Sequence, residues 1–131
     1  MRTLLSLPLV LLLVAVAGCK GDHEKLMAKT TEKMKDAVGI LKSVTDEPTA
    51  KAAAPKLMDV AADLKRLQQD MNRLGEADQA VKKELAEKHG REFIDTSRTL
   101  ASEIDRIRGI PAANAALEQA LRELNWNRLE K

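Results

Sequence analysis

The stretch "LMDVAADLKRLQQDMNRL", from Leu57 to Leu74, carries the clearest pattern of large apolar residues in this chain. These residues recur at alternating intervals of three and four positions: Leu57, Val60, Leu64, Leu67, Met71 and Leu74. Because an α-helix turns once in about 3.6 residues, this spacing places them on one face. Such a helix is stabilised in water mainly by packing of its apolar face. The stretch therefore predicts a helix that packs against other helices in a core.

Turn signals before this stretch mark where its helix starts. The motif "TDEP" at 45–48 ends a preceding helix over about residues 22–44. Asp46 is a suitable N-cap for the second helix, and Pro48 fits its first turn. Pro55 lies inside the second helix and should bend it or delay its regular start.

Two further helices complete the pattern. Gly75 is a natural residue to follow the second helix, and a third helix is predicted over about 77–108, with Gly90 in its interior. The motif "GIP" at 109–111 ends it and begins a fourth helix that reaches about residue 127. Short connections favour antiparallel neighbours. The sequence therefore predicts an all-α protein, an up-down-up-down antiparallel four-helix bundle.

The composition excludes several classes of function. The chain has 131 residues, enough for one domain. Its 22 Lys and Arg residues are almost balanced by 20 Asp and Glu residues, so the net charge of +2 offers no basic surface for nucleic acid. Aromatic residues make up 2%, too few for a base-stacking platform. One cysteine cannot form an internal disulfide. We therefore expect no nucleic-acid partner.

The first part of the chain has the layout of a secretory signal. Arg2 precedes a run from Leu4 to Ala17 that is apolar except for Ser6 and contains Pro8. This run is shorter than the roughly 20 residues that a membrane-spanning helix needs. A positive charge, a short apolar run and then small residues are typical of a signal peptide. The predicted bundle therefore stands behind an N-terminal signal helix.

The apolar run ends in "VAGC", Val16–Cys19, which resembles the lipobox of bacterial lipoproteins. In that family a diacylglyceryl group is attached to the cysteine thiol, a peptidase cuts before the cysteine, and the new amine is acylated. The resemblance implies lipidation of Cys19 and recognition of three residues by the peptidase: Val16, Ala17 and Gly18. It divides the chain into a signal peptide, 1–18, and a mature helical domain, 19–131.

The lipobox also implies a location. In enteric lipoproteins an Asp after the cysteine retains the protein at the inner membrane, and this chain has Lys20 there. We therefore expect a lipid anchor in the outer membrane, facing the periplasm or the exterior, with an envelope protein as a possible partner. Two alternatives remain. "AVA" at 15–17 could be an ordinary cleavage site that leaves the Cys19 thiol free, or the apolar run could stay uncleaved as an anchor.

Three stretches are similar to helices of the periplasmic four-helix b-type cytochromes. They are "MKDAVGILKSVTDEPTAKAAAPKLMDVAADL" at 34–64, "HGREFIDTSRTLASEIDRIRG" at 89–109 and "ALEQALREL" at 116–124. In that family a Met in the first helix and a His in the last hold the haem iron. Met34 matches the first ligand, but residues 111–131 contain no His. The resemblance therefore implies the four-helix fold, and a small haem electron-transfer protein remains an alternative function. We expect no cofactor.

Two histidines and two methionines are candidate site residues. His23, Met27 and Met34 lie on one helical face and are soft ligands that would suit Cu(I). The same pattern fits core packing of both methionines, with His23 in a frayed first turn. His89 could serve as a general base, but no nucleophile and orienting group accompany it, so it is expected to be half-buried beside Gly90. We expect no metal site and no enzyme activity.

The last residue raises one more alternative. The small murein lipoproteins of enteric outer membranes also combine a lipobox with heptads, and their C-terminal Lys is joined to peptidoglycan. This chain ends at Lys131, so a structural link between outer membrane and cell wall is an alternative function. The main expectation is a membrane-anchored envelope lipoprotein whose helical bundle is a non-catalytic interaction domain.

Overall fold

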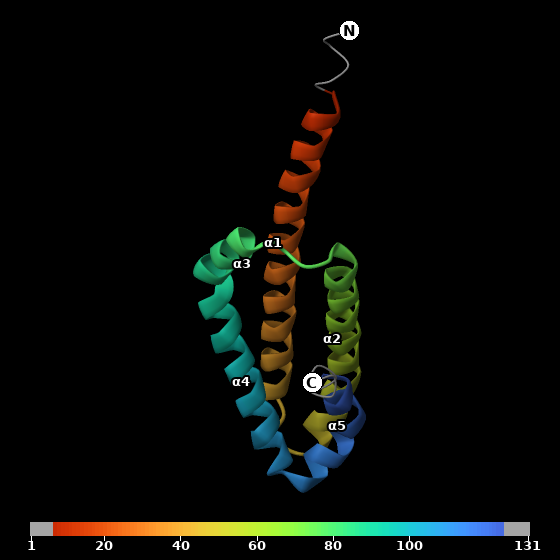
Figure 1. Cartoon of the computed structure of the whole chain (residues 1–131). Helices are drawn as coiled ribbons and strands as arrows, with labels where there is room; N and C mark the ends of the chain where they lie inside the picture. Colours follow the sequence, from red (N-terminus) through yellow and green to blue (C-terminus); the bar gives the residue numbers. More distant parts are fainter. Residues whose placement is uncertain (1–6, 125–131) are drawn as a thin grey trace.

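The computed structural model describes residues 7–124, with side chains from Gly21 onward. All regular secondary structure in this range is helical, which confirms the all-α prediction. The elements are α1 (Leu7–Lys42), α2 (Glu47–Leu74), α3 (Gln79–Leu85), a π-helical turn η1 (Ala86–Gly90), α4 (Arg91–Arg108) and α5 (Pro111–Leu124). In Figure 1, α1 runs along the long axis with α4 on one side and α2 on the other. α5 packs mainly on α2 and also contacts α4.

The start of α2 follows directly from its sequence. The Asp46 carboxylate accepts a hydrogen bond from the Thr49 amide at 3.0 Å, and the Thr49 hydroxyl accepts one from the Asp46 amide at 3.1 Å. This reciprocal pair satisfies amide groups that the first turn leaves without helical partners. Pro48 occupies the first turn as predicted. Pro55 lies inside the helix without delaying its start, so that part of the prediction is wrong.

The core lies at the end of the molecule away from the start of α1. Leu41, Leu57, Ile107 and Leu117 are fully buried there, and small alanines of α2 and α5 let the helices approach closely. The predicted stripe of α2 is buried only in its first half. Leu64 is half-buried against this core, and Leu67, Met71 and Leu74 are half-buried beyond it. The reason is length, because α5 has 14 residues and α2 has 28.

The first helix begins earlier than expected. The pattern predicted a helix from about Asp22, separate from the signal helix, whereas α1 continues unbroken from Leu7 through Gly18 and Gly21 to Lys42. A glycine costs a helix only about 1 kcal/mol relative to alanine, so good helix formers around it can keep the helix intact. Removal of residues 1–18 would therefore cut within this continuous helix.

The third predicted helix contains a π-helical turn at its centre, over Ala86–Gly90. Around this turn the sequence places Val81, Leu85, His89, Phe93 and Ser97 at repeated steps of four. Each step of four turns an α-helix by about 40° more than a full revolution, so several in succession move the stripe off the core. A π-turn inserts one residue and corrects part of this drift. The π-turn therefore explains how residues spaced at steps of four can stay on one side of the helix.

Candidate functional site

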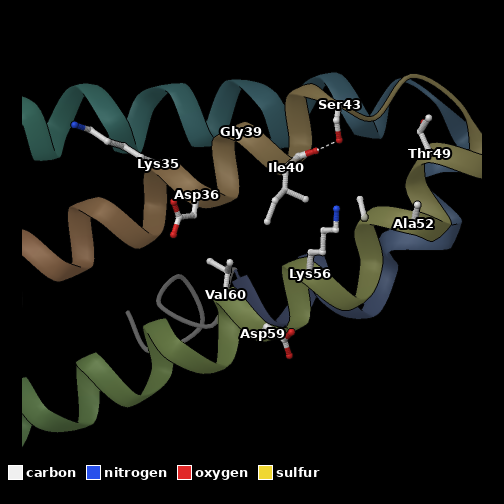
Figure 2. Close-up of a pocket in the computed structure, with 11 residues that line it drawn as sticks. Lys35, Asp36, Gly39, Ile40, Ser43, Thr49, Ala52, Lys56, Asp59 and Val60 are labelled. Carbon is white, nitrogen blue, oxygen red and sulfur yellow. Dashed lines mark hydrogen bonds between the residues drawn. The ribbon is translucent and has the colours of Figure 1, made fainter.

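A surface groove lies between α1 and α2, over the half of the molecule that holds the core (Figure 2). Its volume is about 740 Å³. The groove is lined by eleven residues: Lys35, Asp36, Gly39, Ile40, Ser43, Thr49, Ala52, Ala53, Lys56, Asp59 and Val60. We refer to it below as the α1–α2 groove.

Small residues keep this groove open. Gly39 on α1 and Ala52 on α2 are both exposed, and a Cβ built on Gly39 would meet no atom within 4 Å. Ile40 and Val60, which are half-buried and buried, supply apolar side chains between the two helices. The two backbones therefore present a mostly apolar surface that another chain could approach closely.

Charged side chains of both signs border the groove. Figure 2 shows Asp36 of α1 and Lys56 of α2 pointing into it, whereas Lys35 points away. Lys35 pairs with Glu92 of α4, and Asp36 lies 3.8 Å from Lys33.

Two of the lining charges are not neutralised in this way. Lys56 and Asp59 make no hydrogen bond or ion pair with other residues that the structure describes. They lie on α2 three positions apart, which is nearly one helical turn. Figure 2 shows Lys56 pointing toward α1 across the groove, whereas the Asp59 carboxylate at the edge of the groove points away from α1.

Interhelical contacts hold α1 in place beside the groove. The Lys33 ammonium lies 3.2 Å from the Asp63 carboxylate of α2, and hydrogen bonding to that carboxylate raises the pKa of Lys33 above its usual range. At the end of α1, the Arg106 guanidinium donates to the carbonyl oxygens of Leu41 at 2.7 Å and Val44 at 2.9 Å. The Leu41 carbonyl also accepts a hydrogen bond from the Val44 amide at 3.0 Å, and the Val44 carbonyl lies just beyond the end of α1, so the arginine adds donors where the helix ends.

His89 is half-buried, as predicted, but it has a partner that the sequence did not reveal. Its Nε2 lies 3.0 Å from the Glu24 carboxylate of α1. This hydrogen bond, assisted by the charge of Lys88, lowers the pKa of Glu24 below its usual value, against a smaller opposing effect of burial. The π-turn is thereby tied to α1 near the N-terminal end of the described side chains.

The soft ligands His23, Met27 and Met34, which the sequence places on one helical face, do not converge. His23 and Met34 are eleven residues apart on one helix, and a rise of 1.5 Å per residue separates them by roughly 16 Å, too far to share an ion. His23 is buried, with 7% of its surface exposed, so the expectation of a frayed first turn is wrong. Met34 is buried as a core residue, and Met27 is half-buried. Between Gly21 and Leu124, no three His, Cys, Asp or Glu side chains gather as a metal site would require.

Met34 has a protein contact at the atom that haem would need. The Ser97 hydroxyl of α4 donates to the Met34 sulfur at 3.6 Å. The helical turn that would have to supply the second axial ligand, residues 125–129, lies outside the described residues, as does Lys131.

The lipobox residues Val16, Ala17, Gly18 and Cys19 fall in α1 at positions whose side chains lie outside those described. Among the helices in the described range, none combines the length and the apolar character needed to cross a membrane.

The groove, the Arg106 contact and the Glu24–His89 pair were all missed at the level of sequence. Each joins residues from different helices, and spacing within a helix does not report on such contacts. The one signal in the sequence was the repeated step of four residues around His89, which marks the π-turn.

No protein family, no curated protein and no solved structure matches this chain.

Proposed function

We propose that this chain is a lipid-anchored lipoprotein of the bacterial envelope, whose helical domain is a non-catalytic interaction module. The observation that carries the proposal is "VAGC" at the end of a short apolar run. A cysteine thiol is a good nucleophile for alkylation, and small residues before it leave the backbone accessible to a peptidase. Two or three acyl chains hold a protein at a membrane far more firmly than one.

The fold that we propose for the mature domain, residues 19–131, is an up-down-up-down antiparallel four-helix bundle. The contacts of α1 with α2 and α4, and of α5 with α2 and α4, support it because they are those of a four-membered ring of helices. α3, the π-turn and α4 follow one another without a connecting loop and act as one member of that ring. Such a bundle offers grooves between neighbouring helices for protein partners.

The test is expression of the full chain in a bacterial host, followed by envelope fractionation and intact-mass measurement after detergent extraction. We expect a chain that starts at Cys19 and carries a diacylglyceryl group and an amide-linked acyl chain. Cys19→Ala should abolish both the added mass and membrane retention. A mass that starts at Gly18 with a free thiol would contradict the proposal, as would unchanged membrane retention of Cys19→Ala.

The matched variant for location is Lys20→Asp. In a host that sorts lipoproteins as enteric bacteria do, it should move the protein from the outer to the inner membrane without changing its lipidation. Ala28→Ser, a mild change at an exposed position of α1, should change neither lipidation nor location. An Asp variant that stays in the same fraction as the parent would contradict the outer-membrane part of the proposal.

A further inference from the structure

We propose that a second pocket between α1 and α2 binds the phosphate group of an anionic phospholipid in the membrane that holds the chain. The proposal rests on the proposed function, since it is the lipid on Cys19 that would bring this pocket to a membrane surface. The pocket has a volume of about 370 Å³ and lies between the last turn of α2 and the facing part of α1. Its lining consists of Asp22, Lys25, Leu26, Lys29, Asp70, Arg73 and Leu74. We refer to it below as the end pocket.

Three cations from two helices meet at the end pocket. Lys25 and Lys29 lie about one turn apart on α1, and Arg73 belongs to the last turn of α2. Neither lysine forms a hydrogen bond or an ion pair with another residue that the structure describes. Among the described side chains Arg73 pairs with Asp70 at 3.8 Å, and because Arg73 is highly exposed, water screens this pair. The three cations are therefore available to a phosphate group, whose oxygens accept charged hydrogen bonds.

The charge and the apolar part of the end pocket fit a phospholipid headgroup. Of the two carboxylates, Asp70 offsets Arg73, and Asp22 offsets part of the charge of the two lysines. The lining keeps an excess of one positive charge, which balances the single negative charge of a phosphodiester. A ligand with several negative charges would exceed this balance. Leu26 and Leu74, both half-buried, provide an apolar wall for the glycerol carbons next to the phosphate.

The end pocket lies close to a membrane to which Cys19 is attached. α1 is one continuous helix through this region, and the last turn of α2 lies beside it at the same end of the molecule (Figure 1). A rise of 1.5 Å per residue places Lys25 about 9 Å and Lys29 about 15 Å along the helix from Cys19. The headgroup layer is roughly 5–7 Å thick on each side of a bilayer, and its attraction for cations falls off within a Debye length of about 8 Å. Lys25 therefore lies inside this zone and Lys29 at its edge, whereas the α1–α2 groove, which starts at Lys35, lies outside it.

Attachment to the membrane favours a lipid over a phosphate ion in solution. Exposed lysines and arginines bind a free anion weakly at physiological salt, because dissolved ions screen them. Once the chain is anchored, headgroups surround the end pocket at a high effective concentration, so that even a weak site is filled. Cations near an anionic surface add their attractions, and three act together here. The end pocket would thereby fix the tilt of α1 on the membrane, which the acyl chains alone do not.

The experiment measures how fast each lysine is acetylated while the full chain is held in vesicles. Chain purified from bacterial membranes is incorporated into vesicles of phosphatidylcholine alone, or of equal parts phosphatidylcholine and phosphatidylglycerol, and acetylation is read at each residue by mass spectrometry. We expect Lys25 and Lys29 to react about threefold more slowly in the mixed vesicles, because the bound headgroup shields their amines. Lys51, an exposed lysine near the start of α2, should react at the same rate in both.

Arg73→Glu and Arg66→Glu separate the end pocket from general surface charge. Both arginines are exposed on α2, and both variants have the same net charge, but only Arg73 lines the pocket. The protection of the two lysines should be lost in Arg73→Glu and kept in Arg66→Glu. Protection to the same extent in the two variants, or no protection in the parent, would overturn the proposal. Protection by inorganic phosphate in vesicles of phosphatidylcholine alone would also overturn it, since the site would then take a soluble anion.

Flotation in a density gradient keeps this test apart from that of the lipid anchor. A chain that floats with phosphatidylcholine vesicles has its anchor, and the acetylation rates then decide about the end pocket. A chain that floats only with the mixed vesicles contradicts the anchor. The pocket is then supported if Arg73→Glu abolishes this flotation and Arg66→Glu does not, and it is overturned otherwise. A chain that floats with neither kind of vesicle contradicts both proposals.

Discussion

Arg106 connects two helices that meet only after the chain has folded. Its guanidinium reaches from α4 to the carbonyls of Leu41 in α1 and of Val44 just after α1, and it also donates to the Glu103 carboxylate at 2.9 Å. A planar guanidinium with several fixed donors suits this task, whereas a lysine has a single point charge. The contact fixes the end of α1 beside the core.

Arg106→Met should lower the free energy of unfolding by about 1–2 kcal/mol, because the Val44 carbonyl loses its donor, the Leu41 carbonyl keeps only the Val44 amide, and water can replace the guanidinium only partly. Arg106→Lys should fall between this variant and the parent. Arg108→Met is the matched control, since Arg108 is more exposed and, among the described side chains, pairs with Asp105 alone, at 3.4 Å. Urea denaturation measures all three. Equal losses at positions 106 and 108 would show that the carbonyl contacts contribute nothing.

The Glu24–His89 pair predicts a dependence of stability on pH at the acidic end. The pKa of Glu24 lies below its ordinary value of 4.5 in the folded chain, so the unfolded chain binds a proton there more readily. The stability that Glu24 contributes is therefore complete above about pH 4.5 and is lost as the pH falls through the lowered pKa. Glu24→Gln should reduce the melting temperature at pH 6 and have a smaller effect at pH 3.

Glu123→Gln, at an exposed position of α5, is the control for this measurement. The difference between its melting temperature and that of the parent should stay small at both pH values. A Glu24→Gln variant with the same deficit at pH 3 as at pH 6 would mean that the ionised Glu24 carboxylate does not stabilise the fold.

At the scale of the element, two glycines test the backbone. Gly90 has a helical φ of −60°, and a Cβ there would make only an ordinary 3.7 Å contact with Ala86. Gly90→Ala should therefore raise the free energy of unfolding by about 0.5–1 kcal/mol. Gly75 ends α2 with φ 81° and ψ −174°, a conformation that other residues rarely adopt. Gly75→Ala should cost about 1–3 kcal/mol. Thermal unfolding measures the stability of both variants. Stability changes of the same sign at positions 90 and 75 would contradict the backbone conformations given for these two glycines.

The stripe of α2 should contribute unequally along its length. Leu57→Ala removes a fully buried side chain and should cost about 2–5 kcal/mol. Leu64→Ala, half-buried at the edge of the core, should cost less. Leu74→Ala lies beyond the reach of α5 and should cost about 1 kcal/mol. Denaturant unfolding of the three variants gives the comparison. Equal costs would mean that the half away from the core is packed as densely as the core itself.

The helices and their ends could be predicted because their causes are local. Asp46, Pro48 and Gly75 act within one turn of the boundaries that they set, and the six-residue stripe of α2 required a helix. The π-turn was missed because its cause lies in tertiary packing. Leu85 and His89 are four positions apart, and both have to face the neighbouring helices. A hydrophobic pattern alone does not show which geometry will correct that drift.

The candidate site was far less predictable. Gly39 and Ala52 are unremarkable as residues of two separate helices, and only the packing of α1 on α2 turns them into the walls of a groove. The partners Glu24 and His89 are 65 positions apart in the chain. The relative rotation of two helices decides such contacts, and it depends on every side chain between them.

At the scale of the whole molecule, the core and the proposed anchor are at opposite ends. The core cluster begins at Ala37, and the other buried side chains of α1 are His23, Thr31, Met34 and Val38. α1 carries the chain from the proposed lipid attachment site to this core as one continuous helix. The fully packed end of the domain, and with it the α1–α2 groove, would therefore be held away from a membrane to which Cys19 is attached.

This separation predicts that the helical domain folds without its first 21 residues. A chain that starts at Asp22 keeps the whole core cluster and the contacts of Lys33, Lys35 and Arg106. We expect a cooperative thermal transition by circular dichroism, within about 5 °C of the full chain, because a loss of about 1 kcal/mol shifts a domain of this size by that much. The companion truncation removes residues 115–131 and with them the buried Leu117 and Leu121, so it should abolish cooperative unfolding. A broad, non-cooperative transition in the chain that starts at Asp22 would mean that the apolar N-terminal segment is part of the folding unit, and the core would then not be sufficient by itself.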